Sequence, residues 1–311
     1  MAKSKLKQID QMEVLEHGPL PEKDRQFVTA LARGLDVLRS FRPGERMLGN
    51  QEIAKRTGLP KPTVSRLTYT LTRLGYLRHS AAMSKYSLGT GVLSLGYTLL
   101  ADHDIRRIAR PLMQELADQV HASVSMGSRD RLNMVYVENC RSSATVTLRM
   151  DVGSTIPMAT TAMGRAFLAV LPQWERDYLL ENIKKRNADN WPKIQASLER
   201  SFREYEERGF CTSTGEWQKD VSAVGVPMQT PDGHIVAFNC GGPSFTIKRG
   251  QLEVEVRSSD ASIAATNRRV ASLAVPYSVA GVKGVRNSSQ TGSHHSYSAQ
   301  VPATTTCWPP A

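Results

Sequence analysis

The sequence predicts an α+β protein made of two domains joined by a helix. Its 311 residues suit two domains of ordinary size. The first quarter contains three helical segments followed by a hairpin pattern, and the rest mixes alternating strand patterns with longer helical ones. We expect a flexible lead over residues 1–24, a first domain over residues 25–88 and a linker helix over residues 89–103. A second domain over residues 104–276 and a disordered tail over residues 277–311, rich in Ser, Thr, Pro and Gly, should follow.

Positive charge is concentrated in the first domain. Residues 25–90 contain 12 Lys or Arg and 3 Asp or Glu, whereas residues 104–277 contain 22 and 20, respectively. The whole chain carries a net charge of +11. A basic domain beside a nearly neutral one indicates an anionic partner for the basic domain. Nucleic acid, a membrane surface and simple solubility are all consistent with the charge alone.

Composition argues against several classes of protein. Hydrophobic residues make up 40% of the chain and charged residues 22%, which is not the composition of a wholly disordered chain. The chain has no run of about 18 apolar residues, so we expect no membrane span, and its polar first residues lack the apolar core of a secretion signal. The cysteines are far apart and form no CxxC pair, which fits a reducing cytoplasm and favours neither a disulfide framework nor a zinc site.

The first domain is predicted to begin with two helices and a turn. A helix over residues 27–41 places its apolar residues on one stripe, which consists of Val28, Leu31, Leu35 and Leu38. A short helix over residues 50–56 follows, with Asn50 as its N-cap. Gly58 then lies in a tight turn that favours a positive φ.

The third helix, over residues 61–74, has an apolar stripe and a polar face without a carboxylate. Pro62 suits its first turn, and the stripe consists of Val64, Leu67, Leu71 and Leu74. The polar face combines hydroxyls with cations, and its candidates for DNA contact are Lys61, Thr63, Ser65, Arg66 and Tyr69. A hairpin over residues 75–88 follows and contains Lys85. Three helices and a hairpin form the winged helix-turn-helix pattern, whose third helix enters the DNA major groove. A generic three-helix domain with a solvated basic face is the alternative.

The second domain is predicted to pack helices on a small antiparallel sheet. Strand patterns cover residues 123–126, 132–137, 145–150, 223–228 and 235–240, with a loop over residues 152–157. Helical patterns cover residues 104–120, 158–171, 172–185, 192–209 and 248–274. Pro111 lies inside the first of these helices, so we expect a kink or a break there.

The start of the helix over residues 158–171 is a candidate ligand site. Small residues allow a ligand to approach the backbone, and the free N–H groups of a helix start favour a carboxylate. The residues concerned are Thr160, Thr161, Ala162, Met163 and Gly164. Simple capping and helix packing would use the same residue types and are the alternative.

Two parts of the sequence resemble one known family. The runs RGLDVLRSF, NQEIAKRTGLPKPTVSRLTYTLTRLGYLRHS and KYSLG resemble the DNA-binding domain of the IclR family of bacterial transcriptional regulators. The runs VGSTIPMATTAMGRAFLA and SAVGVPMQTPDGHIVAFNCGGP resemble the effector-binding domain of that family, and the resemblance covers roughly residues 27–276. The resemblance implies a GAF-like or PAS-like fold for the second domain. It also places Arg66 at a position used for base contact, where we expect a guanine edge, while Lys85 would contact phosphate and Lys61 either of them.

The resemblance also implies partners and a ligand. The partners would be double-stranded operator DNA and further copies of the chain, as a homodimer or a dimer of dimers, with Leu93 and Leu100 of the linker as contacts. The ligand would be a small organic acid, aromatic or keto, bound in the second domain. Besides the residues at the helix start, its expected neighbours are Val146, Asp220, Ala223, Asn239, Cys240 and Gly241. We expect Asp220 to accept a hydrogen bond from a ligand hydroxyl, and Cys240 to be a small buried residue rather than a nucleophile.

Signatures of enzymes are missing from the sequence. It contains no GxSxG, HExxH or GxxxxGK[ST] motif, and the segment from Gly89 to Gly91 lacks the third glycine of a dinucleotide fingerprint. His121 and His234 are isolated from any nucleophile or ligand set. We therefore expect no catalytic residue, metal or cofactor. The alternative is a small-molecule-binding enzyme of unrecognised chemistry fused to a basic domain.

Overall fold

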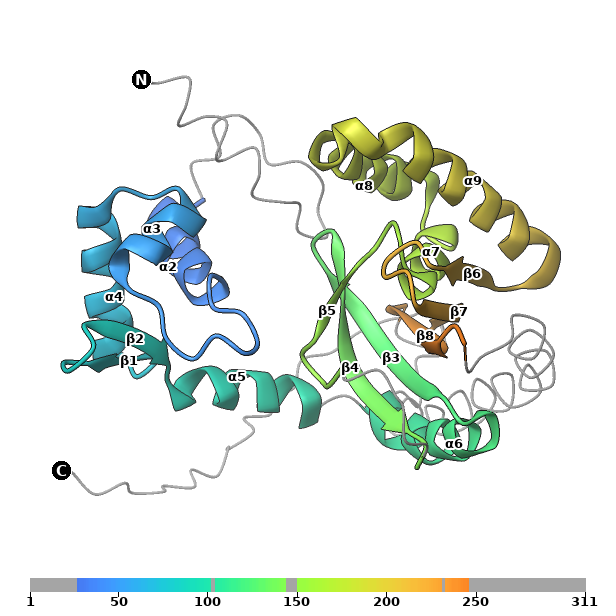
Figure 1. Ribbon diagram of the computed structural model, residues 1–311, viewed down its shortest axis with the longest axis horizontal. Coiled ribbons are helices and arrows are strands. Elements are labelled where there is room, and N and C mark those ends of the chain that lie inside the picture. Colours follow the sequence, from blue (N-terminus) through green and yellow to red (C-terminus); the bar gives the residue numbers. More distant parts are fainter. Residues whose placement is uncertain (1–26, 102–103, 144–149, 231–232, 246–311) are drawn as a thin grey trace, which may run out of the picture. The chain divides into compact units, whose positions relative to one another are not determined.

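The computed structural model describes residues 27–101, 104–143, 150–230 and 233–245 (Figure 1). Its first part contains three helices and a two-stranded hairpin, which are α2 (Thr29–Arg39), α3 (Asn50–Thr57), α4 (Lys61–Arg73), β1 (Leu77–Ser80) and β2 (Lys85–Leu88). The two strands are antiparallel, with Leu77 opposite Leu88. The winged helix-turn-helix arrangement predicted from the sequence is confirmed.

A small hydrophobic core holds these elements together. Its buried residues come from all three helices, the segment before α3 and the hairpin, and they are Val37, Leu48, Ile53, Val64 and Leu77. Gly58 follows α3 with a φ of 67°, the left-handed conformation expected for it. The predicted N-cap of α3 is wrong: Asn50 is already helical, and Gly49 precedes it and donates its backbone N–H to Glu52 Oε2 at 2.7 Å.

The apolar stripe of the first helix is mostly uncovered. Val28, Leu31 and Leu35 are exposed, as is Leu74 at the end of α4, whereas Val37 and Leu38 contribute to the core. The helix therefore presents most of its apolar stripe to solvent in the single chain. Such a surface is typical of a contact with another protein chain.

The linker helix α5 (Thr90–Ala101) starts directly after the hairpin. Gly89 is required at this point, because a Cβ atom there would lie 2.1 Å from the carbonyl oxygen of Gly75. The Gly89 N–H also donates to the carbonyl of Tyr76 at 2.8 Å. These contacts fix the start of α5 against the turn after α4, yet no residue of α5 is buried.

The second part of the chain is built on a six-stranded antiparallel sheet. The strands are β3 (Ser123–Asp130), β4 (Asn133–Arg141), β5 (Thr155–Pro157), β6 (Cys211–Thr214), β7 (Val221–Gln229) and β8 (Ile235–Pro243). Their order across the sheet is β5-β4-β3-β8-β7-β6, so β3 and β8 are central.

Helices cover both faces of this sheet (Figure 1). On one face α6 (Asp104–Val120) packs on β3 and β4, in a core that includes Val124, Met126 and Val224. On the other face α7 (Ala162–Ala169) packs on β7 and β8. The same side holds α8 (Gln173–Arg186), the 3-10 helix η1 (Ala188–Asn190) and α9 (Trp191–Arg208). The sheet therefore separates two hydrophobic cores.

Some predicted details of the second domain differ from the structure. Pro111 does not break α6, because it lies on the exposed side of the helix, where the carbonyl that it leaves unpaired can meet solvent. Residues 155–157 form β5 instead of a loop, and β6 had no counterpart among the predicted strands. The predicted lead, tail and last helix lie outside the described residues, as does the predicted strand over residues 145–150 apart from Met150.

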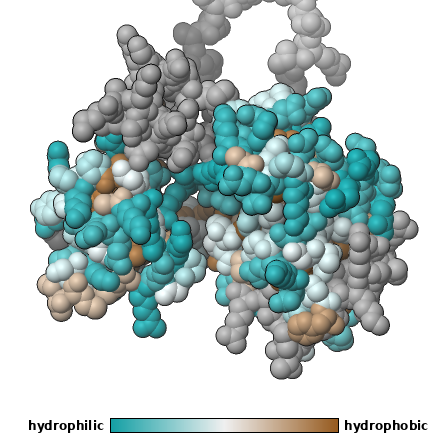
Figure 2. All heavy atoms as spheres, turned by 45° about the horizontal axis from the view of Figure 1, so that its top comes forward, coloured by the Kyte–Doolittle hydropathy of each residue, from teal (hydrophilic) through white to brown (hydrophobic). Residues whose placement is uncertain are grey.

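The surface of the described residues is largely polar. On the face shown in Figure 2, hydrophilic residues cover most of it and hydrophobic residues form small separate patches. None of the helices in the described ranges has the length and apolar character needed to cross a lipid bilayer.

Candidate functional site

The outer face of α4 is a basic surface without carboxylates. Lys61, Ser65, Arg66 and Tyr69 are exposed, and Thr63 is half-buried. None of the thirteen residues of α4 is acidic. Hydroxyl and guanidinium groups can donate hydrogen bonds to base edges and phosphates, and no negative charge on this helix would repel DNA.

Two polar side chains link α3 to α4 behind this face. Asn50 Nδ2 donates to Ser65 Oγ at 3.1 Å, and the buried Thr68 hydroxyl donates to the Val64 carbonyl at 2.9 Å and also contacts Asn50 Oδ1. Asn50 therefore sets the position of α4 relative to α3. Ser65 has this structural role in addition to any contact with a base.

The hairpin lysine is held by an ion pair with α3. Lys85 Nζ lies 3.6 Å from Glu52 Oε2. The pKa of Glu52 is lowered, first by the hydrogen bond from the Gly49 N–H and then by the charge of Lys85. Both side chains are substantially exposed, so a phosphate can compete with Glu52 for the lysine.

Several of the residues predicted at the start of α7 cap the helix or pack against the protein's own backbone and core. Thr161 is its N-cap: its hydroxyl accepts from the Gly164 N–H at 3.3 Å and donates to the Pro157 carbonyl at 2.7 Å. A Cβ atom on Gly164 would lie 2.1 Å from the Met158 carbonyl oxygen, so the close approach that this glycine permits is made by the protein's own backbone. Met163 is fully buried in the core under α7.

Other predicted residues come together on the α7 side of β7 and β8. Ala223 is paired with Gly241, and Asn239 lies two residues before Gly241 on the same face. Ala162 is close to Asn239, because its carbonyl contacts Gly225, the residue opposite Asn239. Thr160 is held nearby, because its carbonyl accepts from Ser213, which is opposite Ala223.

Three predicted residues are placed elsewhere. Cys240 lies between Asn239 and Gly241, so its side chain points to the other face, where it is buried in the core under α6. Asp220 is exposed just before β7, and its backbone carbonyl accepts from the Ser244 N–H at 2.8 Å. Val146 lies outside the described residues.

Polar residues of β3 and β4 that sequence reasoning missed share the face with Asn239. Ser125 is paired with both Asn139 and Asn239, and its hydroxyl donates to Asn139 Oδ1 at 2.8 Å. Burial raises the pKa of Tyr136, while hydrogen bonds with Asn239 and Ser125 act in the opposite direction. The alternation of Ser with Val and Met over residues 123–126 was the signal for this polar face.

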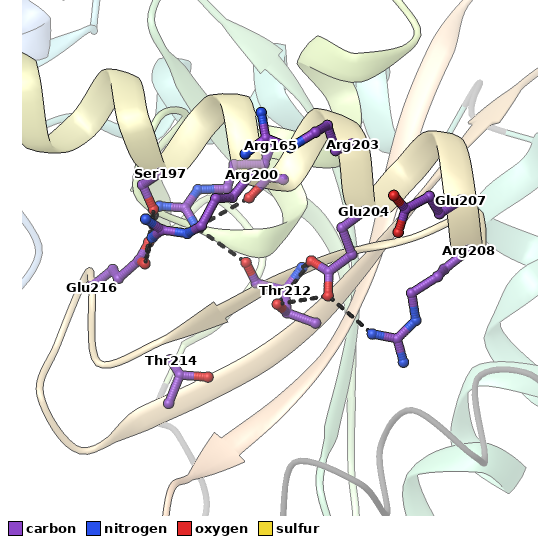
Figure 3. A pocket seen from close by; sticks show the side chains of 11 residues that line it. Arg165, Ser197, Arg200, Arg203, Glu204, Glu207, Arg208, Thr212, Thr214 and Glu216 are labelled. Carbon is purple, nitrogen blue, oxygen red and sulfur yellow. Dashed lines mark hydrogen bonds and ion pairs between the residues drawn. The ribbon is translucent and has the colours of Figure 1, made fainter.

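A pocket of about 350 Å³ lies away from these residues, between α9 and β6 (Figure 3). Its lining is almost entirely polar and comes from α7, α9, β6 and the segment after β6, with Arg165, Ser197, Arg200, Ser201, Arg203, Glu204, Glu207, Arg208, Thr212, Thr214 and Glu216. Arg165 donates to the carbonyls of Ala159 and Thr212 at 2.9 and 3.1 Å and forms an ion pair with Glu216. These contacts satisfy the buried guanidinium within the protein, and they connect the elements at this edge of the sheet.

Within the described ranges, no cluster of three or more His, Cys, Asp or Glu is arranged to hold a metal ion. Cys211 is buried, which raises the pKa of its thiol to about 12 and disfavours the thiolate needed for nucleophilic chemistry.

Models of two protein domains match most of the described chain. The model for the C-terminal domain of the bacterial transcriptional regulator IclR matches residues 97–276. The model for the IclR helix-turn-helix domain matches residues 30–81.

Individual proteins agree with these matches. The chain is 39% identical to the HTH-type transcriptional regulator TsaQ1/TsaQ2 of Comamonas testosteroni, over 78% of this chain and 86% of that protein. It is 49% identical to a crystal structure of an IclR family transcriptional regulator from Brucella abortus, with a TM-score of 0.75 over 83% of this chain and 96% of that one. An IclR homologue from Microbacterium hydrocarbonoxydans, solved in complex with 4-hydroxybenzoate, shares the fold at 18% identity, with a TM-score of 0.59 over 77% of this chain and 99% of that one.

Proposed function

Because the chain belongs to the IclR family of bacterial transcriptional regulators, we propose that it binds operator DNA as a homodimer under the control of a small organic acid. The winged helix binds the DNA, and the second domain binds the acid. Binding of the acid alters DNA binding or transcription activation by favouring one arrangement of the two winged helices over another. Since its target is the chromosome, the protein acts in the cytoplasm.

The observation that carries this proposal is the exposed, carboxylate-free face of α4 inside a winged helix. Lys61, Arg66 and Tyr69 on this face are in a position to reach base edges or phosphates when α4 lies in the major groove. One such helix reads only a few base pairs, so useful specificity requires two copies on a two-fold site. The exposed apolar residues of α2 and α5 supply surfaces for the second copy.

The polar face of the central sheet supports the effector part of the proposal. Asn239, Ala223 and Gly241 lie next to the segment that leads into α7. An aromatic acid is bound by the IclR homologue from Microbacterium hydrocarbonoxydans, and we extend this class of ligand to the present chain.

The proposal is tested by fluorescence anisotropy with the full chain and labelled DNA from the region flanking its own gene. At moderate salt we expect this DNA to be bound at least about a hundredfold more tightly than random DNA of the same length. Benzoate, 4-hydroxybenzoate, pyruvate and lactate are then added to the complex, and at least one should change the affinity. Equal, weak and strongly salt-dependent binding to both DNAs would contradict regulation of the neighbouring genes. It would mean that the first domain binds DNA only through its overall positive charge.

Arg66 is expected to contribute to specificity. Replacing Arg66 with alanine should cost about 1–3 kcal/mol on the specific site and much less on random DNA, because a bidentate contact with guanine is lost. The same anisotropy assay measures both values. Equal losses on the two DNAs would remove the proposed base contact.

Lys85 is expected to contribute to affinity without contributing to specificity. Replacing Lys85 with alanine should weaken binding to all sequences and lower the slope of log affinity against log salt by about one, because one phosphate contact is lost. A salt series with both DNAs measures this slope. An unchanged slope would contradict the proposed phosphate contact of Lys85.

A further inference from the structure

Three buried polar atoms on one face of the sheet have no hydrogen-bond partner among the described residues. They are Ser123 Oγ in β3, Arg141 Nε in β4 and Asn239 Oδ1 in β8. Ser123 is 5% exposed and Asn239 is 8% exposed. Because unpaired buried polar groups destabilise a folded protein, each such atom calls for a physical explanation.

The strand register brings the three residues together. Ser123 is paired with Arg141 on one side and with Gly241 on the other, and Asn239 lies two positions from Gly241 along β8. Residues that are opposite each other, or two apart on one strand, point to the same face of a sheet. All three side chains therefore lie on the α7 side, beside Ala223 and Gly241.

Neighbouring polar side chains on this face do have partners, so the three atoms are an exception. Ser125 and Asn139 are hydrogen-bonded to each other, and Asn139 Nδ2 also donates to the Met150 carbonyl. Asn239 is already a hydrogen-bond partner of Tyr136, which leaves its amide oxygen as the free group.

Arg141 is oriented but not neutralised by its protein contacts. Its terminal nitrogen donates to the Met150 carbonyl and to Asp151 Oδ1, the latter at 2.6 Å. Asp151 is mostly exposed, so solvent screens its charge. The guanidinium therefore keeps an unpaired N–H and most of its attraction for a second anion. Arg165, on α7, differs in this respect because its donors are used by protein acceptors.

We propose that Ser123, Arg141 and Asn239 form the polar end of the effector site and that they select an acid that also carries a hydroxyl group. The Arg141 Nε–H and the Ser123 hydroxyl donate to the carboxylate. Asn239 Oδ1 can only accept a hydrogen bond, so it receives one from the hydroxyl of the ligand. This inference rests on the proposed function, because it assigns the chemistry of the effector.

The test uses isothermal titration calorimetry of the full chain with two matched pairs of acids. In the first pair 4-hydroxybenzoate is compared with benzoate, and in the second lactate is compared with pyruvate, which has a carbonyl in place of the hydroxyl. We expect the hydroxy acid of at least one pair to bind roughly tenfold more tightly than its partner, because the latter leaves Asn239 unpaired. Arg141→Gln should weaken binding of that acid by roughly tenfold or more.

The variant Ser123→Ala separates a binding role from a structural one. Its hydroxyl has no partner in the described structure, so its removal should leave the melting temperature of the free protein unchanged or higher, while the affinity for the hydroxy acid falls. Ser222→Ala is the matched control: Ser222 is equally buried in the same sheet, but its hydroxyl bonds to Ser244 Oγ at 2.8 Å and its side chain belongs to the α6 side. The Ser222→Ala variant should have a lower melting temperature than the wild type and the same affinity for the hydroxy acid.

The outcomes distinguish this inference from the proposal on which it rests. If an acid binds the wild type but Arg141→Gln and Ser123→Ala bind it equally well, or if the members of both pairs bind equally, the present inference is overturned and the effector function stands. If none of the four acids binds the wild-type protein, the effector part of the proposed function is overturned together with it. If Ser123→Ala has a lower melting temperature but an unchanged affinity for the acid, Ser123 contributes only to packing.

Discussion

Replacing Leu93 and Tyr97 together with glutamate should convert the protein to a monomer and reduce its affinity for operator DNA at least about a hundredfold. The two residues are four positions apart and therefore lie on one side of α5. They are 73% and 69% exposed in the single chain. Placing two carboxylates on this side would put like charges against each other in a symmetric contact and would expose them to an apolar partner surface.

The composition of α5 is the reason to expect a large effect. The helix TGVLSLGYTLLA contains no charged residue, and apolar residues occur on all its sides, as is usual for buried helices. None of its residues is buried within the described part of the chain, so its apolar sides are open to contact with another chain. If that chain is a second copy, loss of the contact separates the two winged helices, and the DNA affinity falls because two linked contacts become independent ones.

Sedimentation velocity and the anisotropy assay measure the two consequences. Thr98→Glu is the control, because Thr98 lies on another side of the same helix, where its hydroxyl donates to the Ser94 carbonyl at 3.1 Å. We expect this variant to retain the oligomeric state and DNA affinity of the wild type. A double variant that remains dimeric would show that α5 is covered by something other than a second copy.

The exposed stripe of α2 shows what a helical pattern predicts and what it leaves open. The spacing of Val28, Leu31 and Leu35 predicted an apolar side of a helix, and the structure has that helix. Of the predicted stripe, only Leu38 packs against the core of the domain, to which this helix also contributes Val37. Hydrophobic periodicity identifies an apolar surface, but it does not say whether the same chain or another one covers it.

Strands were predicted well where they alternate strongly and poorly where they are short. The long central strands β3, β4, β7 and β8 follow from alternating segments, whereas β6 reads CTST and β5 has only three residues. Such edge strands are defined by pairing with a neighbour more than by their own composition.

The polar residues that we propose for the effector site were only partly predicted, for a related reason. Asn239, Ala223 and Gly241 were found from the resemblance to a family, whereas Ser123 and Arg141 were not. Their proximity depends on the register that pairs β3 with both β4 and β8. A shift of one residue in the pairing would turn each side chain to the other face of the sheet. The grouping of Ser123, Arg141 and Asn239 could therefore be recognised only once the strand register was known.

Replacing Arg165 with alanine should destabilise the second domain by about 3–5 kcal/mol, the usual cost of removing one partner from a buried ion pair. Arg165 is only 2% exposed, and its guanidinium joins Glu216 to the carbonyls of Ala159 and Thr212. Its removal takes this donor away from the two carbonyls, leaves Glu216 with its contacts to Ser197 and Arg200, and opens a cavity beneath α9. Urea unfolding followed by tryptophan fluorescence reports on this domain, because Trp174, Trp191 and Trp217 all belong to it.

Arg200 provides a control on the same carboxylate. Its terminal nitrogen lies 3.4 Å from Glu216 Oε1, but its side chain is 62% exposed, so solvent already screens the pair. Arg200→Ala should therefore cost less than about 1 kcal/mol. Arg165→Lys should fall between the two alanine variants, because lysine keeps the charge but cannot reach the separate acceptors with a planar fork. Equal losses for Arg165→Ala and Arg200→Ala would mean that the network at this edge of the sheet is solvated and contributes little to the fold.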